Sequence, residues 1–81
     1  MTAALLLRAT MSNMSNRRSS LALCIIADEV LNGKTVDTNS RHVAKKAFSA
    51  GLDLQEIRVI KDDDAMIRKT VLELSQSHDI V

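Results

Sequence analysis

The sequence has no tryptophan or tyrosine and a single phenylalanine, Phe48. A core without large aromatic side chains must be built from Leu, Ile, Val, Ala and Met. A chain of 81 residues also buries a smaller share of its surface than a larger domain does. We therefore expect one small domain at most, with a thin margin between hydrophobic gain and conformational entropy.

Cysteine and histidine are scarce: the chain has one cysteine, Cys24, and two histidines, His42 and His78. A single cysteine cannot form an internal disulfide, which favours a reducing compartment. Cys24 lies in an apolar run, and no neighbour in the sequence would lower its pKa, so we interpret it as a small buried hydrophobe. These three residues have no metal-ligand spacing.

Neither a large excess of charge nor a long apolar run is present. The formal net charge is +1, so the chain has no strong field that would attract nucleic acid. A transmembrane helix needs about 20 consecutive apolar residues, and the sequence has no such run. We therefore expect neither nucleic-acid nor membrane partners.

Acidic residues are absent before Asp28, whereas Arg8, Arg17 and Arg18 precede it. A basic, acid-free segment rich in Ala, Leu, Met and Ser is typical of a mitochondrial transit peptide. The alternative is a disordered extension, or a start of translation further along, at Met11 or Met14. We therefore assign residues 1–20 as a leader or extension outside the fold, and the location as mitochondrial or cytoplasmic.

From residue 20 the pattern changes to that of an ordered domain. Leu21–Ala27 is apolar on both faces, as in a central parallel strand covered on both sides. Asp37–Ser40 supply oxygens that cap a helix, in which Val43, Ala44, Ala47 and Phe48 form one apolar stripe, and Gly51 is placed to end that helix.

The second half of the chain repeats the alternation of strand and helix. Leu52–Ile60 changes its apolar alternation part-way, so a strand here should twist or bulge, or begin near Glu56. Asp62–Asp64 favour a helix start, the helix runs to about Ser75, and His78–Val81 open a third strand. The fold class is therefore α/β, the N-terminal part of a three-layer parallel-sheet domain, incomplete at residue 81. The partial domain would span residues 21–81, and its open sheet edge allows a homo-oligomer.

Ligands of open parallel sheets bind beyond the carboxyl ends of the strands. The residues that follow the first two predicted strands are acidic: Asp28 and Glu29 after the first, with Gly33 and Asp37 further along that loop, and Asp62 after the second. Taken alone, Gly33 is most simply a loop glycine, Asp37 and Asn39 are helix caps, and Asp62 belongs to a solvated helix start. Arg41 and His42 are interpreted as solvent-facing.

Residues 27–39 read Ala-Asp-Glu-Val-Leu-Asn-Gly-Lys-Thr-Val-Asp-Thr-Asn, and residues 59–62 read Val-Ile-Lys-Asp. These segments resemble the patterns Gly-Asp-Glu-Ile-Leu-x-Gly-x-x-x-Asp-Thr-Asn and Val-Val-Pro-Asp of the MoaB/Mog-like molybdopterin-binding domain, in the version found in CinA proteins and in the N-terminal half of FAD synthases. Two departures are Ala27 in place of the first Gly and Lys61 in place of Pro. The Thr-Gly-Gly-x-Gly-Pro loop that follows the third strand in this family, and whose amides would cradle phosphate, is not in the chain.

The resemblance implies that a complete relative acts on a nucleotide- or pterin-type phosphate ligand, by pyrophosphatase action on FAD or ADP-ribose-like compounds or by molybdopterin adenylylation. It implies Mg²⁺ or another divalent metal as cofactor, with Asp62 as the catalytic and metal-binding residue. The substrate-binding residues would be Asp28, Glu29, Gly33, Asp37 and Asn39. The alternatives are a non-catalytic binding or regulatory module and a non-functional truncation product. We expect no turnover from the 81 residues alone.

The leader hypothesis is tested by fusing residues 1–20 to a fluorescent reporter. A basic amphipathic leader should carry the reporter into mitochondria, which is scored by co-localisation with a mitochondrial dye. Replacement of Arg8, Arg17 and Arg18 by Ser in the same fusion is the control and should abolish import. A purely cytosolic signal from the unaltered fusion would contradict the transit peptide and leave the disordered extension or the later start of translation.

Overall fold

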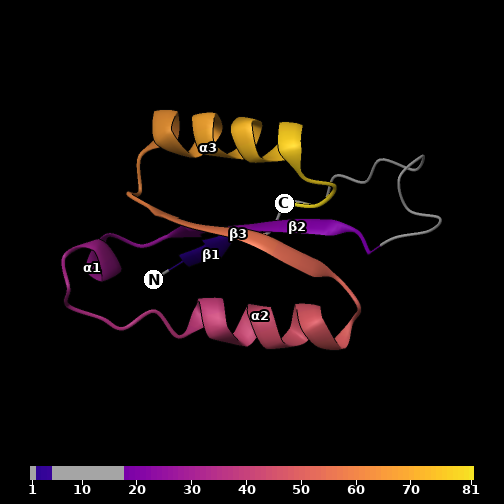
Figure 1. Ribbon diagram of the computed structural model, residues 1–81. Helices are drawn as coiled ribbons and strands as arrows, with labels where there is room; N and C mark the ends of the chain where they lie inside the picture. Colours follow the sequence, from indigo (N-terminus) through magenta and orange to yellow (C-terminus); the bar gives the residue numbers. More distant parts are fainter. Residues whose placement is uncertain (1, 5–17) are drawn as a thin grey trace.

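The structure is a computed structural model that describes residues 2–4 and 18–81 (Figure 1). Along the chain its strands and helices are β1 Thr2–Ala4, β2 Ser20–Ile26, α1 Asp28–Leu31, α2 Asn39–Ser49, β3 Asp53–Ile60 and α3 Asp64–Ser77. In Figure 1, α3 lies on one face of the sheet and α2 on the other. The expected α/β class with three layers is therefore confirmed.

The sheet has the order β1-β2-β3, with β2 in the middle. β2 and β3 are parallel, and β1 runs antiparallel to β2. A parallel pair requires a crossover connection, and here α2 makes it, covering one face of the sheet.

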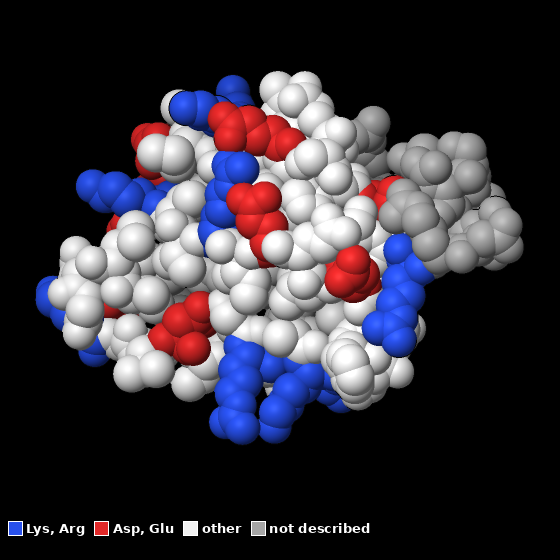
Figure 2. Space-filling model, viewed as in Figure 1, with Lys and Arg blue, Asp and Glu red and all other residues white. Residues whose placement is uncertain are grey.

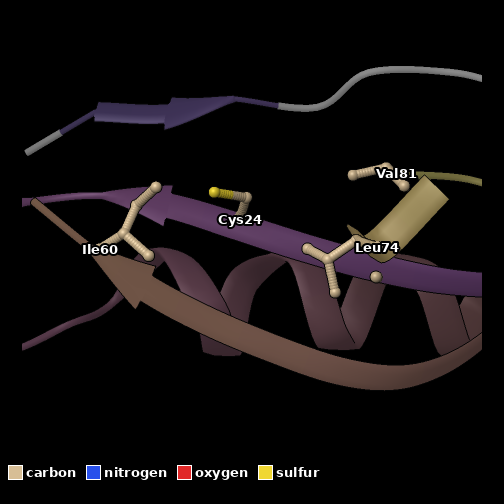
Figure 3. Packing of buried hydrophobic residues seen from close by; sticks show 5 residues of the cluster. Cys24, Ile60, Leu74 and Val81 are labelled. Atoms are coloured by element: carbon tan, nitrogen blue, oxygen red, sulfur yellow. The ribbon is translucent and has the colours of Figure 1, made fainter. Parts of the chain in front are cut away.

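The side chains of β2 point alternately into two layers. Ala22 and Cys24 pack with Ile60, Leu74 and Val81 on the α3 side (Figure 3). Burial raises the pKa of the Cys24 thiol, so Cys24 is a packing residue, as the sequence predicts.

The other side chains of β2 fill the layer on the α2 side. Leu21 packs with Ala47 and Ile80, and Leu23 and Ile25 pack with a second group of apolar residues that includes Val43 and Val59. A strand buried on both faces accounts for the continuous apolar run in the sequence.

A bulge in β3 explains the change in its apolar alternation. Leu21 is opposite Leu54, but Ala22 is opposite Glu56, so Gln55 is an extra residue in the ladder. After the bulge, Ile57 and Val59 lie on the same face of the sheet as Leu54. The predicted bulge is confirmed, and the strand begins at Asp53 rather than near Glu56.

Both ends of α2 lie where the sequence predicts them. The Asp37 carboxylate accepts a hydrogen bond from the Ser40 amide at 3.1 Å. At the other end Gly51 has φ +77°, its amide donates to the Phe48 carbonyl at 3.2 Å, and the Leu52 amide donates to the Ala47 carbonyl at 2.9 Å. This pair of bonds is a Schellman motif, which needs a left-handed residue at the Gly51 position.

The prediction that Phe48 belongs to the apolar stripe facing the sheet is wrong. Phe48 is 75% exposed, whereas Ala47 is buried and Val43 is half-buried. Phe48 lines an open hollow with Leu52, Asp53 and Leu54 at the start of β3, and β3 is an edge strand of the described sheet, so no described strand covers that side.

Charged residues connect α3 to β3. Arg58 donates to Glu56 at 2.5 Å and to Glu73 at 2.6 Å. The hydrogen bond from Arg58 lowers the pKa of the Glu73 carboxyl, so both partners stay ionised at neutral pH. Asp63 caps the start of α3 by accepting from the Met66 amide at 2.9 Å, which confirms the helix start predicted from Asp62–Asp64.

The chain reaches β2 a third time at Ile80, which forms a parallel bridge with Leu21. The Ile80 amide donates to the Ser20 carbonyl at 2.9 Å, and the Ala22 amide donates to the Ile80 carbonyl at 2.9 Å. The predicted opening of a third parallel strand is therefore observed.

Parts of residues 1–20 belong to the fold, contrary to the sequence prediction. Thr2–Ala4 pair with Cys24–Ile26, Ser19 and Ser20 are buried, and β2 begins at Ser20. The unpaired backbone groups along the edge of β2 explain this pairing, because an open edge is a template for any extended segment. The remainder of the predicted leader, residues 5–17, lies outside the described residues.

A reciprocal pair of hydrogen bonds joins the start of β2 to the third strand. The Ser20 amide donates to Asp79 Oδ2 at 2.9 Å, and the Asp79 amide donates to Ser20 Oγ at 2.8 Å. Both residues are about 5% exposed. We call this pair the Ser20–Asp79 clasp, and it satisfies polar groups that would be costly to bury alone.

Replacing Asp79 by Ala should destabilise the protein by about 1–3 kcal/mol, because the buried Ser20 amide loses its acceptor. The control is Asp53→Ala: Asp53 is exposed, so its loss should cost no more than about 0.5 kcal/mol. Urea unfolding followed by circular dichroism measures both. Equal midpoints for the two variants would show that the clasp contributes nothing.

Candidate active site at the carboxyl ends of β2 and β3

β2 and β3 end side by side. The Ala27 amide donates to the Ile60 carbonyl at 3.0 Å, just before the segments that follow the two strands diverge. α1 follows β2 directly, and a short turn leads from β3 into α3. The two loops therefore start from one edge of the sheet, where parallel-sheet proteins bind ligands.

The structure brings Asp28 and Asp62 together. Asp28 Oδ1 accepts a hydrogen bond from the Asp62 amide at 3.2 Å, between residues 34 positions apart in the sequence. Both residues are exposed. This bond joins the first loop to the second and holds the Asp28 carboxylate against the backbone of Asp62 at the rim of the sheet.

The first loop contains a helical turn that the sequence analysis did not predict. α1 begins at Asp28 and includes Glu29, which is half-buried. Gly33 ends the turn with φ +75°: its amide donates to the Val30 carbonyl at 3.1 Å, and the Lys34 amide donates to the Glu29 carbonyl at 2.9 Å. Gly33 thus provides the left-handed residue of a second Schellman motif, which confirms its interpretation as a loop glycine.

Asp37 and Asn39 lie at the start of α2. Asp37 is engaged with Ser40 through both the amide and the hydroxyl, and these hydrogen bonds, that of the Ser40 side chain first, lower the pKa of the Asp37 carboxyl. Asn39 is the first helical residue and Thr38 is the N-cap, so the prediction of Asn39 as a cap is wrong. Within residues 18–81 no hydrogen bond or ion pair links Asp37 with Asp28 or Asp62.

A basic groove beside Asp37 was missed by the sequence analysis. An open hollow of about 400 Å³ is lined by Val36, Asp37, Thr38, Arg41, His42 and Lys45. Figure 2 shows basic side chains gathered along the lower side of the molecule, where α2 lies. The spacing of Arg41 and Lys45, one helical turn apart and without an acidic residue in α2, was the available signal.

The family's glycine before Asp28 is not needed for the backbone conformation here. Ala27 has φ −155°, an extended conformation open to any residue, and its side chain is buried against Leu23 and Ile25. The methyl group of Ala27 therefore belongs to the core and does not project into the loop region. Lys61, in place of proline, is exposed, and its carbonyl accepts from the Asp63 amide at 2.9 Å.

Asp28 and Asp62 are the two carboxylate residues that a hydrogen bond joins at this edge. In the part of the chain that the structure describes, no three His, Cys, Asp or Glu residues are grouped so that they could hold a metal ion. Mg²⁺ is commonly held by one or two carboxylates, with water and substrate phosphates as the remaining ligands. Asp28 and Asp62 fit that partial role and could not by themselves form a closed metal cage.

None of the described helices is long and apolar enough to cross a membrane.

Residues 22–81 match the sequence profile of a family described as "Probable molybdopterin binding domain". The chain belongs to this family. The match starts within β2 and includes the loops that carry Asp28 and Asp62, so the resemblance seen in the sequence is confirmed over most of the domain. No solved structure was found to match the chain.

The chain is similar to longer proteins from animals and bacteria. It is 34% identical over 74 residues to a "Probable FAD synthase" of Caenorhabditis briggsae, covering 91% of this chain and 14% of that protein. With the "Probable FAD synthase" of Caenorhabditis elegans it shares 37% identity over 80% of this chain and 12% of the relative. A "CinA-like protein" of Citrifermentans bemidjiense is 36% identical over 75% of this chain and 15% of the relative. The chain thus spans less than a sixth of each of these three relatives.

Replacing Asp37 by Ala should destabilise α2 by about 0.5–2 kcal/mol at pH 7, the usual cost of losing a capping oxygen. Because the folded-state pKa of Asp37 is lowered, its contribution is fully present above the unfolded pKa of about 3.9. The contribution is lost as the pH falls through the lower folded-state value. Urea unfolding of both proteins at pH 7 and at about pH 3 measures this. A gap between the two proteins that does not shrink on acidification would contradict the charged cap.

Proposed function

We propose that this chain provides the acidic part of a site for a nucleotide- or pterin-type phosphate compound, and that a complete domain of this kind hydrolyses such a compound. The hydrogen bond between the Asp62 amide and Asp28 supports this proposal most directly, since it unites the loops after β2 and β3 at one edge of the sheet. Two loops held together at this edge form the usual ligand position of a parallel sheet.

A divalent cation would allow an anionic ligand to bind beside two carboxylates, because its positive charge offsets the repulsion between them. Asp62 would hold Mg²⁺ directly, with Asp28 beside it, and the remaining positions would be taken by water and phosphate oxygens. When bound, the cation would neutralise charge on the phosphates and polarise the bond to be broken. The chain's own part is to position the carboxylates: Asp28 does so through the Asp62 amide, and α1 places Asp28 at the end of β2.

The basic groove on α2 would attract the rest of an anionic ligand. Arg41 and Lys45 line the hollow beside Asp37, and cationic side chains of this kind hold phosphate oxygens. In this arrangement Asp37 and Asn39 act on the ligand indirectly, because they form the start of the helix that carries the basic residues. Glu29 and Gly33 likewise shape the first loop.

The relatives support the class of ligand. The two nematode proteins are named probable FAD synthases, and FAD is a dinucleotide whose two halves are joined by a pyrophosphate. We therefore take FAD, ADP-ribose and pterin phosphates as the compounds to test. A non-catalytic binding module is the second candidate, because the described residues contain no group of three His, Cys, Asp or Glu side chains that could hold a metal ion.

Substitution of Asp62 by Asn should weaken binding of Mn²⁺, used in place of Mg²⁺, on the order of 10-fold or more in the presence of ADP-ribose. The backbone amide at position 62 can still donate to Asp28 in this variant, so the loops stay joined while the charge is lost. Paramagnetic broadening of amide signals during a Mn²⁺ titration measures the affinity. In the unaltered protein it should start at the amides of Asp28 and Asp62.

The matched control is Asp64→Asn, which removes the same charge two residues further on, in the first turn of α3. Affinity should fall less in the control than in Asp62→Asn, because the Asp64 carboxylate would act on the ion through solvent and not as a ligand. Equal loss in both variants would show a diffuse charge effect and no site.

Hydrolysis of FAD and ADP-ribose by a chain extended through the glycine-rich loop distinguishes an enzyme from a binding module. If the extended chain is an enzyme, Asp62→Ala should lower its rate of hydrolysis about 100-fold.

A further inference from the structure

One edge of β2 binds two different partners. The Ser20 carbonyl and the Ala22 amide both bond to Ile80, so the backbone groups of even-numbered residues of β2 point to this edge. Odd-numbered residues point to β3: the Ala27 amide bonds to Ile60, and the Ser19 carbonyl accepts from Asp53. By the same alternation the backbone groups of Cys24 and Ile26 point to the Ile80 edge.

β1 occupies those groups. Thr2 is opposite Ile26 and Ala4 is opposite Cys24 in an antiparallel ladder. Since even-numbered residues of β2 point this way, these two are hydrogen-bonded pairs, and Ala3 with Ile25 is the non-hydrogen-bonded pair between them. Ile80 and β1 therefore lie end to end along the same edge, one parallel and the other antiparallel to β2.

A strand that continued from Ile80 in register would need the groups that β1 uses. Ile80 is opposite Leu21, so Val81 would lie opposite Ala22, and further residues would lie opposite Leu23, Cys24, Ile25 and Ile26 in turn. We propose that β1 is an exchangeable edge strand: it covers β2 from Cys24 to Ile26, and a parallel strand joined after Val81 would displace it.

The incoming strand would have an advantage over β1 because it is covalently joined to a residue next to its binding position. It would be joined to Val81, whose neighbours Asp79 and Ile80 are already fixed by the Ser20–Asp79 clasp and the bridge, so its effective concentration at the edge is high. β1 contributes three residues, and the chain that joins β1 to β2 is longer than the direct link between Val81 and a strand joined to it. The displacing strand should be apolar on both faces, since β2 is buried on both sides.

The occupant of this edge can be read out with the native Cys24, the chain's one cysteine. Ala4→Cys places a second thiol directly opposite Cys24, in a pair whose Cα atoms lie at about 5.5 Å, within disulfide range. Ala3→Cys is the matched control, because its position in the ladder faces the other layer. Each protein is refolded with reduced and oxidised glutathione, which takes up the two electrons and protons that the thiols give up.

The same substitutions are made in a chimera in which the segment that follows the match in the C. elegans relative is joined after Val81. We expect the Ala4→Cys disulfide to form readily in the 81-residue chain, and its equilibrium with glutathione to fall at least about 10-fold in the chimera. Equal cross-linking in chain and chimera would overturn exchange. Equal cross-linking of Ala3→Cys and Ala4→Cys would overturn the register on which the proposal depends.

Hydrogen exchange gives a measurement without cysteine substitution. Ala4→Pro removes an amide that donates to β2, whereas Ala3→Pro removes one that points away. The Cys24 and Ile26 amides should exchange at least about 10-fold faster in Ala4→Pro than in Ala3→Pro in the 81-residue chain, and the two variants should match in the chimera. Unchanged protection of Cys24 and Ile26 in Ala4→Pro would refute the role of β1.

Discussion

The pairing of β2 on both edges and its burial on both faces constrain the rest of the structure. Its backbone groups need a partner on each side, because unpaired amides and carbonyls are costly in a buried strand. β3 supplies that partner on one edge, and β1 together with Ile80 supplies it on the other. Its side chains define the two layers in which α2 and α3 pack. A change in β2 therefore affects both layers at once.

The position of the acidic residues follows from this arrangement. Asp28 is placed by the end of β2 and Asp62 by the end of β3, and each is fixed to a strand that the core holds rigid. Their one mutual hydrogen bond therefore joins two supports that are already close, and the carboxylates remain exposed to solvent. Such a site can be preorganised for a cation and a phosphate without a buried charge, which avoids a large desolvation cost.

Local patterns predicted most of the elements, and tertiary contacts decided the rest. The apolar run before Asp28, the capping carboxylate of Asp37 and the glycine at position 51 each depend on neighbours in the sequence, and each was interpreted correctly. Phe48 was misplaced because helical periodicity defines a stripe but not how wide a sheet lies under it. The contact between Asp28 and Asp62 was expected only as proximity, and α1 was missed because one helical turn has no periodicity to detect.

The Ser20–Asp79 clasp would also set the order of side chains in any strand joined after Val81. With Ile80 fixed beside Leu21, its side chain enters the α2 layer, and that of Val81 enters the α3 layer. In an in-register strand, even positions beyond Val81 would inherit the first layer and odd positions the second. A single residue inserted at this point would exchange the side chains of the α2 layer with those of the α3 layer, so the clasp determines which residues of such a strand are buried in each layer.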